Sequence, residues 1–284
     1  MLIYNTIFET RSEIRDILLS GKTIGLVPTM GALHRGHISL LKKARQENDI
    51  VVLSIFINPI QFSKGEDLDK YPQTFEEDCK LALEAGTDIV FAPTSKEMYP
   101  DQLKTKVKVL GVTEYLCGEK RANHFTGVTT VIAKFLNIVP CDNIYFGQKD
   151  YQQFLVVKQI INDLNFPAEI VLCPIVRDYD GLALSSRNRY LNKEERQEAL
   201  CLKEALDAAK DLITAHKIRE VKEIEYTLIH IFECYSLVKL EYIFIGIADN
   251  LEPITKIPEG RKVLIALAVS IGETRLIDNL LLQI

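Results

Sequence analysis

The chain has 284 residues, of which 47% are apolar, and a formal net charge of −5. The apolar fraction is enough for a sizeable core and excludes a disordered chain, and the acidic balance argues against a nucleic-acid-binding protein. No apolar run approaches the roughly 18 residues of a transmembrane helix, and the first residues lack the apolar core of a signal sequence. We therefore expect neither a membrane protein nor a secreted one.

The six cysteines lie far apart in the sequence and form no Cys-x-x-Cys pair. This spacing gives no support to a zinc site or to a dithiol redox centre. It fits reduced thiols in a cytoplasmic protein better.

Strand and helix patterns alternate along the first 175 residues. Short apolar runs rich in β-branched residues predict strands, and apolar residues at helical spacing predict helices. The predicted order is strand 23–28, helix 38–48, strand 50–57, a helix ending at Gly86, strand 87–92, helix 128–139, strand 143–146, helix 151–164 and strand 169–173. Such alternation predicts an α/β fold, a Rossmann-like parallel sheet with helices on both faces. Ligands of such sheets bind beyond the carboxyl ends of the strands.

The pattern changes after residue 175. A loop at 177–189, rich in Asp, Gly, Ser and Arg, precedes a helix from 192 to about 216, a helix at 221–234 and strands at 238–246, 262–270 and 276–281. We therefore divide the chain into a Rossmann-like domain, residues 1–175, and a smaller C-terminal α+β lid domain, residues 176–284.

Two capping boxes mark predicted helix starts. Thr74-x-x-Glu77 predicts the start of the helix that Gly86 ends, and Asn192-x-x-Glu195 predicts the start of the long helix of the second domain.

The segment Met30–His37 joins a predicted strand to a predicted helix and contains His34-Arg35-Gly36-His37. A helix start offers unpaired N–H groups to a phosphate, and glycines allow the backbone to approach a ligand closely. The two imidazoles add donors that can become cationic as negative charge develops. The Gly31-x4-Gly36 spacing resembles a Walker A loop, but His37 stands where that loop has Lys. We interpret the segment as a phosphate site; the alternative is two ordinary loop histidines.

Asn58 and Gln61 follow the strand predicted at 50–57. Their amides donate and accept hydrogen bonds without charge, which suits a hydroxylated acid whose carboxylate must stay nucleophilic. The alternative is a simple Asn-Pro turn.

Two further segments offer phosphate contacts. Gly147-Gln148-Lys149-Asp150 follows a predicted strand, and Lys149 supplies a point charge while Asp150 can cap the next helix, bind a ribose hydroxyl or bind Mg²⁺. Leu184-Ser185-Ser186-Arg187 offers two hydroxyls and a guanidinium as a phosphate clamp. The alternatives are an ordinary helix start and a solvated basic linker.

Other chemistry-bearing residues are less specific. Among Asp67, Asp69, Glu76, Glu77 and Asp78 one could support Mg²⁺, although a solvated helix start explains most of them. His124 is a candidate for the same site or for a structural role.

Taken together, these segments resemble the pantothenate synthetase (pantoate–β-alanine ligase) family, within the wider H-x-G-H nucleotidyltransferase-like superfamily. The resemblance covers nearly the whole chain. It rests on Pro28-Thr29-Met30-Gly31-Ala32-Leu33-His34-x-Gly36-His37, Phe56-Ile57-Asn58-Pro59-Ile60-Gln61-Phe62, His124-Phe125-x-Gly127-Val128-x-Thr130-Val131, Tyr145-Phe146-Gly147-x-Lys149-Asp150-x-Gln152-Gln153 and Asp180-Gly181-Leu182-Ala183-Leu184-Ser185-Ser186-Arg187-Asn188.

The resemblance implies a two-step condensation of (R)-pantoate with β-alanine. The pantoate carboxylate attacks the α-phosphate of Mg²⁺-bound ATP, giving pantoyl adenylate and pyrophosphate. The amine of β-alanine then attacks the acyl carbon, giving pantothenate and AMP. It also implies small-molecule substrates only, a homodimer and a cytoplasmic place in coenzyme A supply.

The resemblance also implies roles for particular residues. His37 would be catalytic, with His34 beside it; Gln61 would contact pantoate and the β-alanine position, and Gln153 would contact pantoate. The residues implied for ATP are Met30, Gly31, Ala32, Leu33, His34, Arg35, Gly36, His37, Gly147, Gln148, Lys149, Asp150, Val176, Leu184, Ser185, Ser186 and Arg187.

One segment departs from the family pattern. Arg-Pro-Gly usually precedes the His-Phe pair, and this chain has Arg121-Ala122-Asn123 instead. Losing Pro and Gly changes the backbone freedom of that loop.

Two other functions compete with the ligase. One is an adenylyltransferase that hands AMP to a phosphate monoester, which the uncharged Gln61 and Gln153 argue against because a phosphate acceptor favours cations. The other is a nucleotide sensor that keeps the fold without catalysis.

Overall fold

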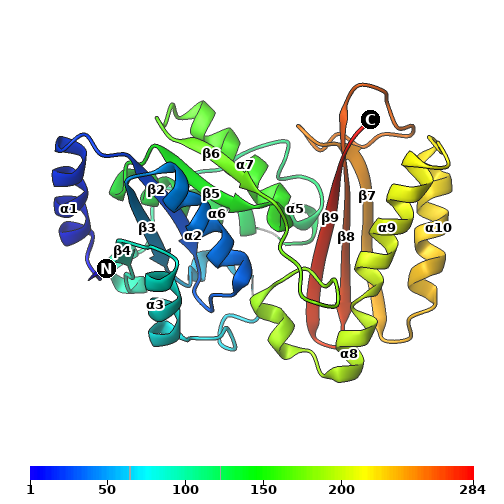
Figure 1. Ribbon diagram of the computed structural model, residues 1–284, viewed down its shortest axis with the longest axis horizontal. Helices are drawn as coiled ribbons and strands as arrows, with labels where there is room; N and C mark the ends of the chain where they lie inside the picture. Colours follow the sequence, from blue (N-terminus) through cyan, green and yellow to red (C-terminus); the bar gives the residue numbers. More distant parts are fainter. Residues whose placement is uncertain (64, 122) are drawn as a thin grey trace. The chain divides into compact units, whose positions relative to one another are not determined.

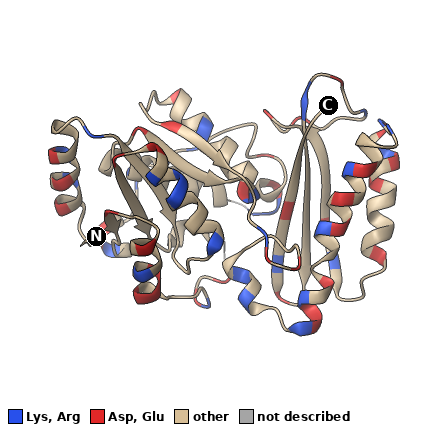
Figure 2. Cartoon of the chain, in the orientation of Figure 1, with Lys and Arg blue, Asp and Glu red and all other residues tan. Residues whose placement is uncertain are grey.

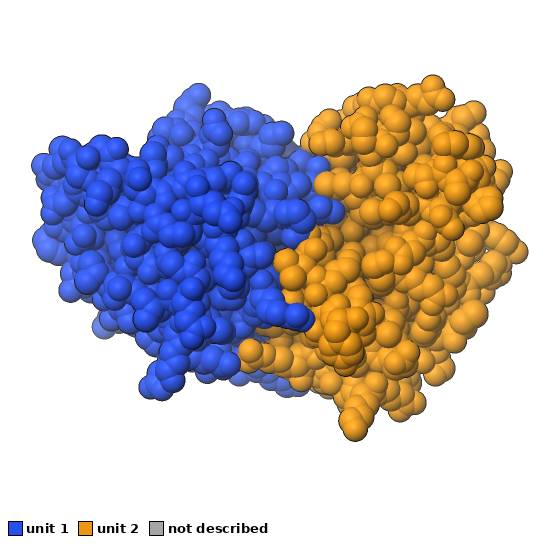
Figure 3. Space-filling view, viewed as in Figure 1, with its two compact units in different colours: residues 1–174 blue, residues 175–284 orange. Residues whose placement is uncertain are grey.

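The computed structural model describes residues 1–63, 65–121 and 123–284. The chain forms two compact units, Met1–Pro174 (unit 1) and Ile175–Ile284 (unit 2) (Figure 3).

The described residues of unit 1 form a six-stranded sheet in the order β1-β4-β3-β2-β5-β6, with every strand pair parallel (Figure 1). The strands are β1 (Leu2–Tyr4), β2 (Ile24–Thr29), β3 (Ile50–Ile55), β4 (Ile89–Phe91), β5 (Asn143–Gly147) and β6 (Glu169–Cys173). The strands β2, β3 and β5 contain no Lys, Arg, Asp or Glu. Charged residues lie instead on helices such as α1 (Ile7–Leu19) (Figure 2). Uncharged, largely apolar strands of this kind suit burial on both faces of a parallel sheet.

Helices cover both faces of this sheet. On one face α2 (Arg35–Glu47) and α3 (Phe75–Glu84) pack over Val27, Val51 and Leu53. On the other, α6 (His124–Ile138) brings Phe135 edge-on to Phe91 of β4, with 6.1 Å between ring centroids. The remaining helices of unit 1 are α1, α4 (Ser95–Met98), α5 (Cys117–Lys120) and α7 (Tyr151–Asp163), with short 3₁₀ turns η1 (Pro59–Gln61) and η2 (Gln148–Asp150). The predicted parallel sheet with helices on both faces is confirmed.

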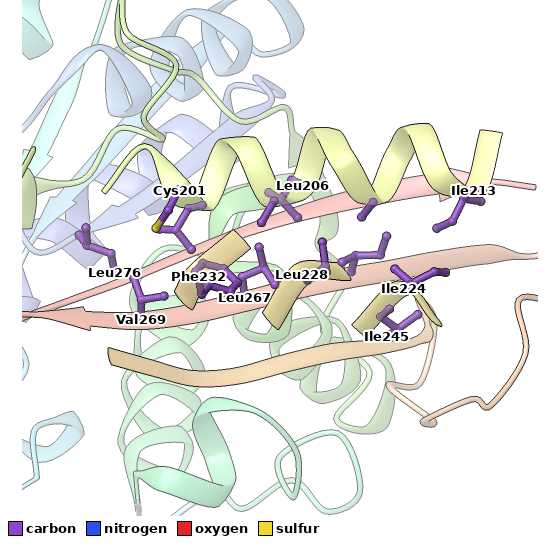
Figure 4. Close-up of a cluster of buried hydrophobic side chains, with 14 of the residues drawn as sticks. Cys201, Leu206, Ile213, Ile224, Leu228, Phe232, Ile245, Leu267, Val269 and Leu276 are labelled. Atoms are coloured by element: carbon purple, nitrogen blue, oxygen red, sulfur yellow. The ribbon is translucent and has the colours of Figure 1, made fainter. Parts of the chain in front are cut away.

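Unit 2 is a three-stranded antiparallel sheet with helices. Its strands are β7 (Val238–Ile247), β8 (Lys262–Ile271) and β9 (Thr274–Gln283), and its helices are α8 (Lys193–Glu198), α9 (Cys201–Thr214) and α10 (Val221–Glu233). Leu206 of α9, Leu228 of α10 and Leu267 of β8 meet in one apolar core (Figure 4). The predicted smaller α+β fold is confirmed.

Several predicted elements differ from the structure in detail. The helix predicted from 192 to about 216 is two helices, α8 and α9, although the capping box of Asn192 and Glu195 is present. The sequence pattern missed β1 and α1, because β1 has only three residues and α1 leaves Phe8 83% exposed and Leu19 77% exposed. Exposed apolar side chains blur the periodicity on which such predictions rest.

The helix predicted to start at Thr74 does start there, but the predicted capping hydrogen bond is absent. Thr74 precedes α3, but its hydroxyl makes no hydrogen bond to the helix backbone. The hydroxyl donates instead to Oδ1 of Asp78, at 3.1 Å. This contact ties the helix start to a buried carboxylate, whose partners are described below.

Within the parts of the chain that the structure describes, no helix is both long enough and apolar enough to cross a bilayer.

Candidate active site

The topology of the sheet in unit 1 indicates where a ligand would bind. The chain runs from β2 to β3 and β4 on one side and later to β5 and β6 on the other, so the strand order reverses between β2 and β5. These two strands pair through Gly25 and Asn143. In open parallel sheets ligands bind beyond the carboxyl ends of the strands at such a point. The segments Met30–His37 and Gly147–Asp150 follow β2 and β5 there.

The turn between β2 and α2 requires left-handed backbone at two consecutive residues, Gly31 (φ 81°) and Ala32 (φ 50°). His34 then caps α2, and its Nδ1 accepts a hydrogen bond from the backbone N–H of Gly36 at 3.1 Å. In return, Nδ1 of His37 accepts from the backbone N–H of His34 at 3.3 Å. The two rings stack with centroids 4.0 Å apart. This capping explains why α2 begins at Arg35 and not near residue 38 as predicted.

These hydrogen bonds fix the protons on the two imidazoles. A backbone N–H can only donate, so Nδ1 of His34 and Nδ1 of His37 carry no proton and each neutral ring has its proton on Nε2. Desolvation of the half-buried ring, followed by the charge of Lys149, lowers the pKa of His37 to about 4. Near neutral pH His37 is therefore a neutral Nε2–H donor in this structure. That it becomes cationic as negative charge develops stays a prediction.

Asp78 of α3 also holds this turn, and its sequence context did not single it out. Its side chain is 1% exposed and accepts from the backbone N–H of Ala32 at 2.9 Å and of Leu33 at 2.7 Å. A Cβ added to Gly31 would lie 3.0 Å from Oδ2 of Asp78, so the glycine also permits this close approach. In the sequence, Asp78 looks like one member of an acidic, solvated helix start. Its oxygens accept hydrogen bonds within this turn and from Thr74, which argues against a role as a metal ligand.

Gln61 lies in η1, after β3, and its side chain joins this turn. Its Nε2 donates to Sδ of Met30 at 2.9 Å, and its Oε1 accepts from Nδ2 of Asn58 at 3.0 Å. Both amides are buried. The structure thus brings two of the segments predicted to follow strands, those of Met30 and Gln61, into direct contact.

The backbone of Gln61 is held by α6. Nδ1 of His124 lies 2.8 Å from the carbonyl oxygen of Gln61, and a Cβ added to Gly127 would lie 2.6 Å from Cα of Gln61. His124 therefore carries its proton on Nδ1, and its Nε2, 3.0 Å from Nη1 of Arg121, accepts. Arg121 in turn makes two hydrogen bonds to the carboxylate of Glu66, at 2.7 and 2.6 Å. Of the two roles considered for His124, this contact supports the structural one, because the ring holds the backbone of Gln61.

The departure from the family pattern falls at the start of α6. Asn123 has φ 66°, in the left-handed region that favours glycine and that Asn tolerates better than most residues. Asn123 can therefore replace the glycine without changing the backbone path at its own position. Ala122 lies outside the described residues.

The segment after β5 supplies charge close to His37. Lys149 lies in η2 and pairs with Asp150 at 3.2 Å. Asp150 precedes α7 but makes no capping hydrogen bond. Gln153 lies in the first turn of α7, and no hydrogen bond links it to Gln61 in the described structure.

The predicted nucleotide contacts of unit 2 lie in one segment. The backbone N–H of Leu184 donates to the carbonyl of Val176 at 3.0 Å, so these two predicted nucleotide-binding residues are adjacent. Ser185 caps the 3₁₀ turn η3 (Ser186–Tyr190) by accepting from the N–H of Arg187 at 3.3 Å.

This segment is anchored within unit 2 by an ion pair. Arg177 makes two hydrogen bonds, at 2.6 and 3.0 Å, to Asp278 of β9, whose side chain is 1% exposed. Arg177 also donates to the carbonyl of Gly181 at 3.1 Å.

The donor groups of the protein offer no ready-made metal centre. No group of three or more His, Cys, Asp or Glu side chains among the described residues is arranged to hold a metal ion. Mg²⁺ in ATP-dependent enzymes is commonly held by substrate phosphates with one or two carboxylates, which needs no such group.

The family model for pantoate-beta-alanine ligase matches residues 2–281 of the chain. The chain belongs to this family. It is 50% identical to the pantothenate synthetase of Caldicellulosiruptor saccharolyticus over 284 residues, covering 100% of both chains. It is also 50% identical to that of Moorella thermoacetica over 284 residues, covering 100% of this chain and 99% of the relative.

Solved structures of ligases from this family have the same fold. The pantothenate synthetase from Thermus thermophilus matches with a TM-score of 0.92 and 41% identity, covering 99% of both chains. The ligase from Francisella tularensis, solved in complex with beta-gamma ATP and beta-alanine, matches with a TM-score of 0.81 and 36% identity, covering 99% of this chain and 97% of that one. The predicted family resemblance is confirmed.

Proposed function

We propose that this chain condenses (R)-pantoate with β-alanine through a pantoyl adenylate, with ATP as the co-substrate. In the first step a carboxylate oxygen of pantoate bonds to the α-phosphorus of ATP, and the bond to the bridging oxygen breaks as pyrophosphate leaves. In the second step the amine of β-alanine bonds to the acyl carbon, AMP leaves with the bonding electron pair, and the amine loses a proton. The products are pantothenate, AMP and pyrophosphate.

The observation that carries this proposal is the contact between two kinds of group at one sheet edge. His34 and His37 present neutral N–H donors, and the amide of Gln61 reaches the same turn through Met30. Phosphate oxygens gain charge as pyrophosphate leaves, and donors fixed in advance stabilise that charge. An uncharged amide can bind the pantoate carboxylate and leave it nucleophilic, because it forms no ion pair.

The assignment of substrates to residues in unit 1 follows from this geometry and from family membership. We assign the ATP phosphates to Met30–His37 and Gly147–Asp150, with His37 as the catalytic residue and Lys149 as a point charge. Gln61 binds pantoate and borders the β-alanine position, and Gln153 also binds pantoate.

In unit 2 we assign the adenine to the backbone of Val176 and the outer phosphates to Leu184–Arg187. The hydrogen bond between Leu184 and Val176 supports treating the two as one nucleotide-binding segment. This gives residues 1–175 the role of nucleotide- and pantoate-binding domain and residues 176–284 the role of lid domain.

Three further assignments complete the proposal. Mg²⁺ held by the ATP phosphates would supply positive charge near the leaving pyrophosphate. The enzyme works in the cytoplasm, which fits cysteines that form no disulfide. It is a homodimer, which sedimentation of the purified chain would test directly.

The proposal is tested by following AMP and pyrophosphate with purified protein and Mg²⁺-ATP. We expect pyrophosphate release to require pantoate, and steady AMP release to require both pantoate and β-alanine. AMP release that depends on neither acid nor amine would overturn the ligase assignment. Transfer of AMP to a phosphate monoester would point to an adenylyltransferase instead.

A further inference from the structure

The orientation of the Asn58 side chain can be assigned from its partners. One side-chain atom lies 3.2 Å from the carbonyl oxygen of Gly127, and another lies 2.8 Å from the hydroxyl of Tyr99. A peptide carbonyl only accepts, so the atom facing Gly127 is the NH₂ group, Nδ2. The atom facing Tyr99 is therefore the carbonyl Oδ1, and the tyrosine hydroxyl donates to it. Asn58 is 1% exposed, which makes an unsatisfied amide oxygen costly.

This orientation fixes the side chain of Gln61 in turn. The second hydrogen of Asn58 Nδ2 points to the Gln61 side chain, 3.0 Å away, so the atom of Gln61 that faces it is Oε1. The NH₂ group of Gln61 then faces Met30 and the β2–α2 turn, with 2.9 Å between Nε2 and Sδ. Hydrogen bonds run in one direction from Tyr99 through Asn58 to Gln61 and Met30. Successive hydrogen bonds in such a series polarise and strengthen one another.

Tyr99 is well placed to begin this series of hydrogen bonds. It ends the short helix α4, its ring lies 6.1 Å from that of Phe56, and Nζ of Lys134 lies 5.5 Å from its ring centroid. Burial raises the pKa of Tyr99, so its hydroxyl keeps its proton and remains a donor. No sequence motif marked this residue.

We propose that Tyr99 is a positioning residue for the acid substrate, because its hydroxyl, together with the carbonyl of Gly127, holds Asn58 in the orientation that makes Gln61 present N–H donors to pantoate. This inference rests on the proposed role of Gln61. A carboxylate needs donors, and a reversed Gln61 amide would turn its carbonyl oxygen toward the anion. Tyr99 itself touches no substrate in this scheme and acts only through the two amides.

The test compares steady-state kinetics of the full-length enzyme and its Tyr99→Phe variant. Losing the hydroxyl should raise the KM for pantoate about tenfold, the effect of about one hydrogen bond, while the KM for ATP changes less than twofold. Tyr4→Phe is the matched control, because it also removes a tyrosine hydrogen bond in unit 1, to Glu13, and it should leave both KM values unchanged.

A double-mutant cycle separates positioning from general structural damage. If Tyr99 acts through Gln61, adding Tyr99→Phe to Gln61→Ala should change the KM for pantoate by less than twofold. A full tenfold effect in that background, an equal rise in the KM for ATP, or an unchanged KM for pantoate in the single variant would overturn the inference.

Two further comparisons keep the result interpretable. If Tyr99→Phe does not yield folded protein, Asn58→Asp tests the same series of hydrogen bonds, because it keeps the acceptor for Tyr99 and removes the donor to Gln61. We expect the same selective rise in the KM for pantoate. The absence of this rise counts against the inference. If the unaltered enzyme shows no dependence on pantoate, the proposed function itself fails. If it needs pantoate but Tyr99→Phe behaves normally, only the role of Tyr99 fails.

Discussion

His34 and His37 use their Nδ1 atoms on the backbone, which leaves Nε2–H as the donor of each ring. Two neutral donors stacked at a helix start can both approach a phosphate without repelling each other as two cations would. The chemistry proposed here therefore depends on fixed donors more than on proton transfer by imidazole.

The first prediction separates the two functions of His37. His37→Ala removes both the acceptor for the backbone of His34 and the Nε2–H donor, whereas Asn at this position can keep an acceptor near the place of Nδ1. Both variants should lower kcat roughly 10²-fold, because both lose the donor to the developing charge. Urea unfolding should show a loss of stability mainly for the Ala variant. A normal kcat for His37→Asn would assign the imidazole a purely structural role.

The lowered pKa of His37 predicts how stability changes with pH. The pKa is about 4 in the folded protein and 6.5 in the unfolded chain, so between these values the unfolded chain binds a proton that the folded protein does not. Stability contributed by the neutral ring is present above pH 6.5 and is lost as the pH falls toward 4, by about 3 kcal/mol. Urea unfolding of the wild type and His37→Asn across this range measures the difference. Parallel pH curves for the two would contradict the prediction.

Asp78 supplies the third prediction. Asp78→Asn keeps one acceptor and turns an NH₂ group toward a buried backbone N–H of the Ala32–Leu33 pair. We expect a loss of about 2 kcal/mol in the free energy of unfolding and a rise of about tenfold in the KM for ATP. Glu77→Gln, at an exposed neighbouring position, is the control and should do neither. Equal effects of the two variants would remove Asp78 from the ATP site.

At the scale of elements, the start of α6 combines a strained backbone position with the residues that hold Gln61. Asn123 occupies the left-handed region immediately before His124, and Gly127 lies one turn further on. The geometry of Gln61 therefore depends on where this helix begins.

The fourth prediction concerns this position. Asn123→Ala should lower the free energy of unfolding by about 1 kcal/mol. Alanine, unlike asparagine, has no polar side chain that can hydrogen-bond locally, so it disfavours the left-handed backbone conformation. Asn123→Gly should match the wild type or exceed it. Urea unfolding of both variants measures the order, and a more stable Ala variant would be inconsistent with the φ of Asn123.

The parallel strands β2 to β6 could be predicted because their apolar runs are local and continuous, and α7 because its apolar spacing is regular. The start of α3 at Thr74 could be predicted, but the loss of its capping hydrogen bond could not, since the hydroxyl of Thr74 bonds to Asp78 instead of the helix backbone. The H-x-G-H segment and Gln61 were recognisable because their residues are close in sequence. Asp78 and Tyr99 were not, because Asp78 contacts a residue 46 positions away and Tyr99 one 41 positions away. Contacts of that span leave no local pattern.

At the scale of the whole molecule, the proposed reaction draws on both units. The proposal assigns the imidazoles and the amides of unit 1 to the reacting groups, and it assigns the segment Leu184–Arg187 of unit 2, anchored through Arg177 and Asp278, to ATP. We expect changes in unit 2 to affect ATP and to leave pantoate recognition largely intact.

The fifth prediction tests this division. Arg187→Ala should raise the KM for ATP about tenfold or more, because it removes a guanidinium assigned to the phosphates, with little change in the KM for pantoate. Arg189→Ala removes an exposed guanidinium from the same 3₁₀ turn and is the matched control. Initial rates at varied ATP and varied pantoate give both constants. A larger effect on pantoate than on ATP would refute the division.

The hydrogen bonds that the Nδ1 atoms of His34 and His37 accept from the backbone have a consequence for repeated turnover. Rings that neither gain nor release a proton leave each round in the state in which they entered it. In the proposed reaction such rings would need no step that restores their protonation between product departure and the arrival of fresh nucleotide.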